Sequence, residues 1–130
     1  KPIDEVIMHE LTNCIKYPKY KLGVYAIDLD NRKLLFDMIL NNIHEETIEK
    51  RIKSRSDMGI YLTNGSFIKF VYPHDGARGH RFNGVIVDNS VYMDLLDCVI
   101  YRSLIPLFIK DKTITFLDNV HFIDLDELHK

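Results

Sequence analysis

The chain has 130 residues, a length that fits one domain with its own hydrophobic core. Hydrophobic residues make up 46% of the sequence and charged residues 28%, a balance that argues against disorder. The formal net charge of -2 gives no overall case for binding nucleic acid or a membrane, so any basic surface has to be local. No apolar run in the sequence approaches the roughly 20 residues that span a bilayer. These properties predict a single domain over residues 1–130, with no membrane partner and a cytoplasmic location.

Hydrophobic periodicity predicts three elements in the first part of the chain. Apolar side chains three and four residues apart predict an amphipathic helix over 3–15. The apolar run 21–30 predicts a strand. The segment 32–53 approaches helical periodicity, and Asn41-Asn42 could divide it into two shorter helices.

The second part of the chain carries signals for a hairpin, a strand, a helix and terminal strands. Two apolar runs flank Asn64-Gly65 within 58–73 and predict a tight hairpin. The segment 84–88 predicts a strand, 90–101 a helix, and 112–128 one or two short terminal strands. This order favours an α/β fold, with one mainly parallel sheet, an antiparallel hairpin and helices packed against the sheet.

Residues 58–108 carry an ordered set of motifs: NGS at 64–66, RG at 78–79 and an apolar strand, GVIVD, at 84–88. In this order the motifs resemble the middle of the ATPase domain of phage terminase large subunits, which have a RecA-like fold. The resemblance implies a truncated, terminase-like domain of phage or prophage origin, a viral protein that would act in the host cytoplasm. It places the strand 84–88 where the family has its Walker B strand.

Two departures from this family argue against ATP hydrolysis. The chain contains no GxxxxGK[ST], the P-loop whose backbone N–H groups and lysine hold nucleotide phosphates. Asp88 matches the family's magnesium-binding aspartate, but Asn89 stands in place of the usual glutamate that activates water. An amide cannot do this, because it has no basic site near neutral pH. The resemblance therefore implies a non-hydrolysing relative, and we expect neither enzyme activity nor a cofactor.

A basic loop precedes the strand 84–88. Its basic residues are His74, Arg78, His80 and Arg81. Arginine side chains match the geometry of phosphate, and the loop's glycines let backbone amides approach a ligand. Together with Asp88 and Asn89 at the end of the strand, these residues form the predicted site for a phosphate-bearing ligand, a nucleic acid or a protein partner. The alternative is a solvated loop whose arginines pair with a carboxylate such as Asp75.

Asp88 also has a purely structural interpretation. A carboxylate before a helix that begins near Ser90 would cap its first backbone amides. The histidines suggest no metal site, because no two of them lie at HxxxH or HxH spacing. Neither Cys14 nor Cys98 has a local histidine partner, so we expect reduced, structural cysteines and no metal.

These features predict a non-catalytic, regulatory binding protein that contacts its ligand through the basic loop. One alternative is an accessory ATPase component of DNA packaging or replication. In it, Arg78 or Arg81 would act as an arginine finger for a neighbouring subunit that carries the P-loop. Another alternative is a structural protein–protein interaction module whose basic loop is incidental. Terminal strands with unpaired edges also predict a homo-oligomer.

Overall fold

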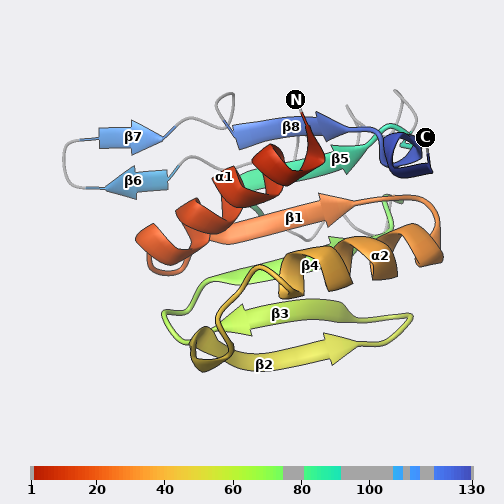
Figure 1. Ribbon diagram of the computed structural model, residues 1–130. Coiled ribbons are helices and arrows are strands. Elements are labelled where there is room, and N and C mark those ends of the chain that lie inside the picture. Colours follow the sequence, from red (N-terminus) through yellow and green to blue (C-terminus); the bar gives the residue numbers. More distant parts are fainter. Residues whose placement is uncertain (1, 75–80, 92–106, 110–111, 115–118, 130) are drawn as a thin grey trace.

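The structure, a computed structural model, describes residues 2–74, 81–91, 107–109, 112–114 and 119–129. Its main sheet consists of six strands: β1 (Lys21–Tyr25), β2 (Ile48–Lys53), β3 (Met58–Leu62), β4 (Phe67–Val71), β5 (Gly84–Asp88) and β8 (Val120–Ile123). They lie side by side in the order β2-β3-β4-β1-β5-β8 (Figure 1). β1 pairs in parallel with β4 and β5, and β5 pairs in parallel with β8. β3 pairs antiparallel with β2 and β4. The expected α/β fold with a mainly parallel, mixed sheet is confirmed.

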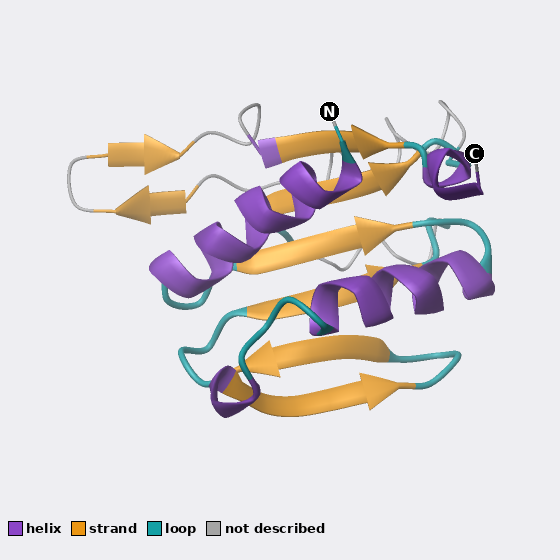
Figure 2. Ribbon diagram, viewed as in Figure 1, coloured by secondary structure: helices purple, strands orange, loops and turns teal. Residues whose placement is uncertain are grey.

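Two α-helices, α1 (Ile3–Lys16) and α2 (Leu29–Leu40), cover the same face of this sheet (Figure 2). α1 confirms the predicted first helix and turns an apolar stripe towards the sheet: Ile3, Val6, Ile7, Leu11 and Cys14 are buried. α2 begins after Asp28, whose side chain accepts a hydrogen bond from the backbone N–H of Asp30. In the part of the chain that is described, no helix has the length and apolar character to cross a membrane.

The central strands β1 and β5 are buried on both faces. Leu22, Val24 and Ile86 belong to the core beneath the helices. Tyr25, Val85 and Val87 belong to a second cluster, built around Phe82, on the opposite face. Burial on both faces explains why these strands appear in the sequence as continuous apolar runs.

The β3–β4 hairpin turns at Asn64 and Gly65, as predicted. Gly65 has a φ of 88°, in the left-handed region that glycine adopts without strain. Asn64 Nδ2 donates a hydrogen bond to the carbonyl oxygen of Cys14 at 2.9 Å, which fastens the turn to the end of α1. The shorter elements are the 3-10 helices η1 (Glu45–Thr47) and η5 (Leu125–His129) and a hairpin of β6 (Leu107–Ile109) and β7 (Lys112–Ile114), which lies beyond the amino end of β8 (Figure 1).

The helix expected over 32–53 is wrong for its last six residues, which form β2 at the edge of the sheet. α2 ends at Leu40, in agreement with a break at Asn41-Asn42. Ile48 and Ile52 are four residues apart, a spacing that fits one face of a helix and also one face of a strand. Antiparallel pairing with β3 shows that this segment is a strand.

Of the other predicted elements, some are confirmed, one strand is shorter than expected, and one helix lies mostly outside the described residues. The strand over 84–88 is confirmed as β5, and the terminal segment 112–128 contains β7 and β8. The strand expected over 21–30 already ends at Tyr25, because α2 begins at Leu29. The helix expected over 90–101 falls, beyond Val91, outside the described residues.

The parallel arrangement of β4, β1 and β5 gives the sheet two distinct ends. We call the residues that follow these strands (72–74, 26–28 and 89–91) the carboxyl end, and those that precede them or β8 (19–20, 81–83 and 119) the amino end. In open α/β sheets, ligands bind outside the carboxyl ends of the strands.

Candidate functional site

A pocket of about 340 Å³ lies at the carboxyl end of the sheet, between α2 and the ends of β3 and β4. Four basic residues line it: Arg32, Arg55, Lys69 and His74. The side chains of Lys69 and Phe70 point to opposite faces of β4, and Lys69 Nζ lies 5.6 Å from the ring centroid of Phe67, on the face away from the helices. Asp57 also lines the pocket, and apolar residues of β3 and β4 complete its wall. Ligand pockets range from about 300 to 1,000 Å³, so this volume suits a small ligand.

Arg32, in the first turn of α2, is the most firmly held of these basic groups. It is 7% exposed, and its Nη1 donates hydrogen bonds to the backbone carbonyls of Ala26 and Ile27, each at 2.9 Å. The donors on Nε and Nη2 have no hydrogen-bond partner among the described residues. Arg32 therefore holds a fixed positive charge next to the end of β1, with donors that no described residue uses.

The electrostatic surroundings of Arg32 favour an anion in the pocket. Burial lowers the pKa of its guanidinium, Asp28 and Tyr72 oppose that change, and the positive charge of Arg55 adds to it. Arginine nevertheless stays protonated in proteins. Arg32 and Arg55 therefore repel each other, and an anion between them would relieve the repulsion.

Two aromatic rings flank the basic groups. The Cζ of Arg32 lies 5.5 Å from the ring centroid of Tyr72, a side chain that is 46% exposed. The rings of Tyr72 and His74 lie 5.5 Å apart, tilted by 32°. Exposed aromatic rings beside cations are the surfaces on which proteins stack nucleobases.

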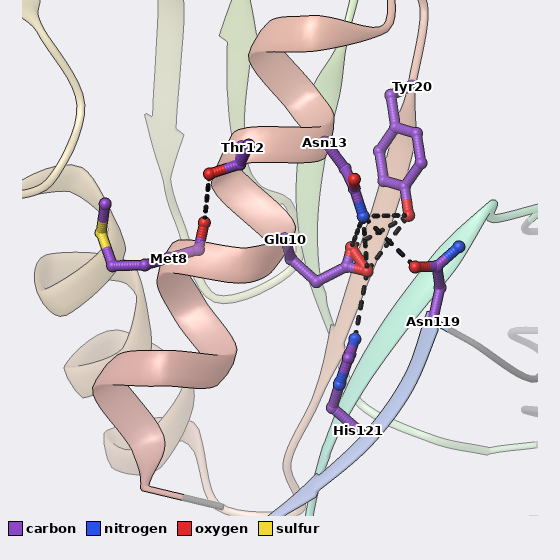
Figure 3. Close-up of polar contacts among 7 residues, drawn as sticks. All are labelled: Met8, Glu10, Thr12, Asn13, Tyr20, Asn119 and His121. Carbon is purple, nitrogen blue, oxygen red and sulfur yellow. Dashed lines mark hydrogen bonds and ion pairs between the residues drawn. The ribbon is translucent and has the colours of Figure 1, made fainter.

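A buried polar cluster lies towards the amino end of the sheet, between α1 and β8 (Figure 3). Glu10 is fully buried, and the hydroxyl of Tyr20 donates to its two carboxylate oxygens at 2.9 and 3.1 Å. Asn13 Nδ2 lies 3.3 and 3.5 Å from the same oxygens and 3.2 Å from Asn119 Oδ1. His121 Nε2 lies 3.3 Å from Glu10 Oε1. A buried carboxylate is costly unless its oxygens accept hydrogen bonds, and this cluster supplies the donors.

The cluster also determines the protonation of two neighbouring groups. Burial, and then the negative charge of Glu10, raise the pKa of Tyr20 above its ordinary range, so its hydroxyl remains a donor. The same two causes raise the pKa of Cys14, which is a free, buried cysteine. Cys14 therefore remains a neutral thiol, as expected of a structural cysteine.

Because Gly84 has no side chain, the carboxylate of Glu10 has room to lie against β5. A Cβ at this position would lie 2.4 Å from the hydroxyl oxygen of Tyr20 and 2.6 and 2.8 Å from the carboxylate oxygens of Glu10. Any side chain at position 84 would thus displace the hydrogen bonds of the cluster.

The structure separates the residues of the predicted binding site. His74 lines the carboxyl-end pocket. Asp88 is the last residue of β5 and Asn89 follows it, and β1 lies between β5 and β4, so both are about 10 Å from the end of β4. Arg81 is exposed at the amino end, because it precedes β5. Arg78 and His80 lie outside the described residues, and the arginine-finger role of Arg78 or Arg81 stays a prediction.

The carboxylate of Asp88 makes two hydrogen bonds to the backbone. It is 2% exposed, and its oxygens accept from the backbone N–H groups of Ser90 at 3.2 Å and Leu125 at 3.1 Å. These bonds match the structural interpretation of Asp88 and tie β5 to the start of η5. Asn89 donates its backbone N–H to the carbonyl oxygen of Ile123 at 2.9 Å, and its side chain is exposed.

Sequence reasoning missed most of the groups that the structure brings together. Arg32 could have been found, since a basic residue in the first turn of a helix after a parallel strand lies at the carboxyl end of the sheet. Glu10 and His121 are 111 residues apart, and no spacing rule connects them. Their contact depends on the packing of α1 against β8.

Comparison of the chain with protein-family models, with curated proteins and with solved structures gave no match.

Proposed function

We propose that this chain is a non-catalytic binding protein whose carboxyl-end pocket binds a phosphate-bearing ligand of mononucleotide size. The observation that carries the proposal is the presence of Arg32 and Arg55 at one pocket, with Asp57 as the acidic residue of the described lining. Two permanent cations beside one carboxylate leave an excess of positive charge. Phosphate is the common biological group that best matches such an excess, because each oxygen accepts charge-assisted hydrogen bonds.

The two arginines would contribute differently. Arg32 is already held in place by its bonds to the carbonyls of residues 26 and 27, so it loses little side-chain entropy on binding. Arg55 is exposed, so it can adjust to the ligand. A rigid arginine and an adjustable one can both make charge-assisted hydrogen bonds to the same phosphate group.

The rings of Tyr72 and His74 support a nucleotide in particular. A base stacked on these rings would place its phosphate towards the cations, because the guanidinium of Arg32 lies over the ring of Tyr72. The pocket volume is at the lower end of the range for ligand sites, which favours one nucleotide over a dinucleotide.

The same end of the sheet supports a role without hydrolysis. β1, residues 26–28 and α2 form a strand–loop–helix unit, the type of unit that carries a P-loop in hydrolysing enzymes. This loop, Ala26-Ile27-Asp28, contains no glycine, and Arg32 binds two of its carbonyls. We extend the proposal to the ancestry of the chain: a truncated, terminase-like RecA fold of phage or prophage origin that regulates a partner by binding its ligand.

Isothermal titration calorimetry with AMP tests the proposal. We expect one site per chain with a dissociation constant of about 0.1 mM, and weaker binding of both adenosine and inorganic phosphate. Arg55→Ala should weaken AMP binding about tenfold, because it removes a charged hydrogen-bond donor. The matched control is Lys33→Ala, which removes an exposed cation from α2 next to Arg32 but outside the pocket lining.

Two results would contradict the proposal. One is equal AMP affinity in the wild-type chain and Arg55→Ala. The other is tighter binding of single-stranded oligonucleotides than of AMP, with a steep salt dependence that Lys33→Ala reduces as much as Arg55→Ala. This second result would indicate a diffuse nucleic-acid surface in place of a mononucleotide pocket.

A further inference from the structure

We propose that His9, Glu10 and His121 form a binding site for a divalent transition-metal ion, with Zn²⁺ as the ion that fits best. Each of the three residues offers one ligand atom, and these atoms all lie within 4.8 Å of one another. Two imidazoles and one carboxylate are a ligand set that zinc proteins use. The site lies towards the amino end of the sheet and shares no residue with the carboxyl-end pocket, so it is independent of the proposed function.

The distance between Glu10 and His121 fits shared coordination of one ion. Zinc binds imidazole nitrogen and carboxylate oxygen at about 2.0–2.1 Å, so two ligands of a tetrahedral site lie about 3.3 Å apart. His121 Nε2 and Glu10 Oε1 are 3.3 Å apart. These two atoms are therefore spaced as two corners of a zinc tetrahedron.

His9 supplies the third metal ligand and lies where a metal ion would enter from the solvent. Its side chain is exposed, and its ring lies 5.0 Å from the ring of His121 at an angle of 66°. No two of the three ligand atoms are more than 4.8 Å apart, so reaching the tetrahedral spacing requires a movement of at most roughly 1.5 Å, which a rotamer change in the exposed His9 provides. A metal ion reaches the buried pair from the solvent side through His9, and water takes the fourth position on that side.

Hydrogen bonds from neighbouring side chains hold the Glu10 carboxylate in position for metal binding. The hydroxyl of Tyr20 and the amide of Asn13 both donate to Glu10, so its position does not depend on a metal (Figure 3). Metal sites generally have such hydrogen bonds behind their ligands, and these bonds contribute to affinity. Gly84 keeps the necessary space open.

A bound ion would lie between His121 and Glu10 in place of their direct contact. In the metal-free protein, a proton on His121 Nε2 can face Glu10 Oε1, and that nitrogen must release it to coordinate Zn²⁺. The bound ion joins α1 to β8, elements separated by more than a hundred residues. Zinc is therefore expected to stabilise the folded chain against unfolding.

Zinc titration of the purified full chain, after treatment with a chelator, tests the site. We expect one Zn²⁺ per chain with a dissociation constant of about 1 µM or lower, measured by calorimetry and by competition with a chromophoric chelator. His9→Gln should weaken binding at least tenfold. It removes an exposed ligand, so the variant should fold normally. The control is His44→Gln, which removes another exposed histidine outside the cluster and should leave the affinity unchanged.

A second measurement needs no substitution in the buried cluster. In an ¹⁵N-labelled chain, zinc should shift the imidazole nitrogen signals of His9 and His121 and leave those of His44 and His74 unchanged. The proposal is overturned if wild-type zinc affinity is weaker than about 100 µM. It is also overturned if His9→Gln binds as tightly as the wild type, or if the shifted signals belong to other histidines.

Discussion

The two ends of the sheet differ in how their charged groups are stabilised. At the amino end, Glu10 is completely buried and each carboxylate oxygen accepts hydrogen bonds from the protein itself. At the carboxyl end, Arg32 and Arg55 lie close enough for their charges to repel, at the wall of an open pocket. The first arrangement stabilises the fold, and the second leaves binding capacity for a ligand. Substitutions of the buried polar groups at the amino end should therefore change stability, and those of the arginines at the carboxyl end should change AMP binding.

Gly84→Ala should have the largest effect on stability. Its Cβ would lie 2.4 Å from the hydroxyl oxygen of Tyr20 and 2.6 Å from the nearer oxygen of Glu10, so the cluster must rearrange around a buried carboxylate. We expect the free energy of unfolding to fall by about 3 kcal/mol in urea denaturation. Gly59→Ala is the control, because its Cβ would come no closer than 3.2 Å to the carbonyl oxygen of Ile68. Equal losses in the two variants would contradict the account of the amino end.

Tyr20→Phe should have the next largest effect. The variant keeps the buried ring but removes the O–H that donates to both oxygens of Glu10. We expect a loss of about 2 kcal/mol in the free energy of unfolding, because a buried acceptor loses its donor. Tyr61→Phe, at a half-buried tyrosine whose hydroxyl makes no described hydrogen bond, should change stability by less than about 0.5 kcal/mol. A Tyr20→Phe variant as stable as Tyr61→Phe would show that the hydroxyl is unimportant.

Alkaline pH should destabilise the fold through the same cluster. The pKa values of Cys14 and Tyr20 are raised in the folded chain above their ordinary values of 9.0 and 10.0. Above these values the unfolded chain loses protons that the folded chain retains, so stability falls as pH rises. The expected slope is about 1.4 kcal/mol per pH unit for each group, beginning near pH 9. Urea denaturation between pH 7 and 11 measures it, and Tyr20→Phe should reduce the slope above pH 10. An unchanged slope in that variant would assign the effect to other groups.

Arg55→Ala should have the smallest effect on stability. Arg55 is exposed, and no described carboxylate forms a salt bridge with it. We expect the free energy of unfolding to change by less than about 0.5 kcal/mol. Combined with the loss of AMP binding proposed above, this result would separate the roles of the two ends. A loss of stability as large as that of Tyr20→Phe would show instead that the pocket is part of the structural core.

The sequence predicts the central part of the fold well, because those elements depend on local patterns. The apolar stripe of α1, the Asn64-Gly65 turn and the run 84–88 are each visible within a short window. β2 is misread because Ile48 and Ile52 satisfy two periodicities at once. Local patterns cannot decide between a helix and an edge strand when few of the residues are buried.

Only part of the candidate site can be predicted from the sequence, because local patterns do not show which distant residues meet in the folded chain. His74 lies at the pocket because it follows β4, the second strand of the predicted hairpin. Arg32 and Arg55 reach the pocket from α2 and from the β2–β3 turn, and only the assembled sheet brings them together. The Glu10–His121 contact joins opposite parts of the chain and leaves no local pattern.

The most direct test of the central claim is an NMR titration of the ¹⁵N-labelled chain with AMP. The account predicts that backbone amide signals shift at Arg55–Met58 and at Lys69–Tyr72, on the wall of the pocket. Amide signals of Asn13, Tyr20 and His121 at the amino end should stay where they are. Shifts at the amino end without shifts at the pocket, or no shifts at all at millimolar AMP, would contradict the claim that the carboxyl-end pocket is the binding site.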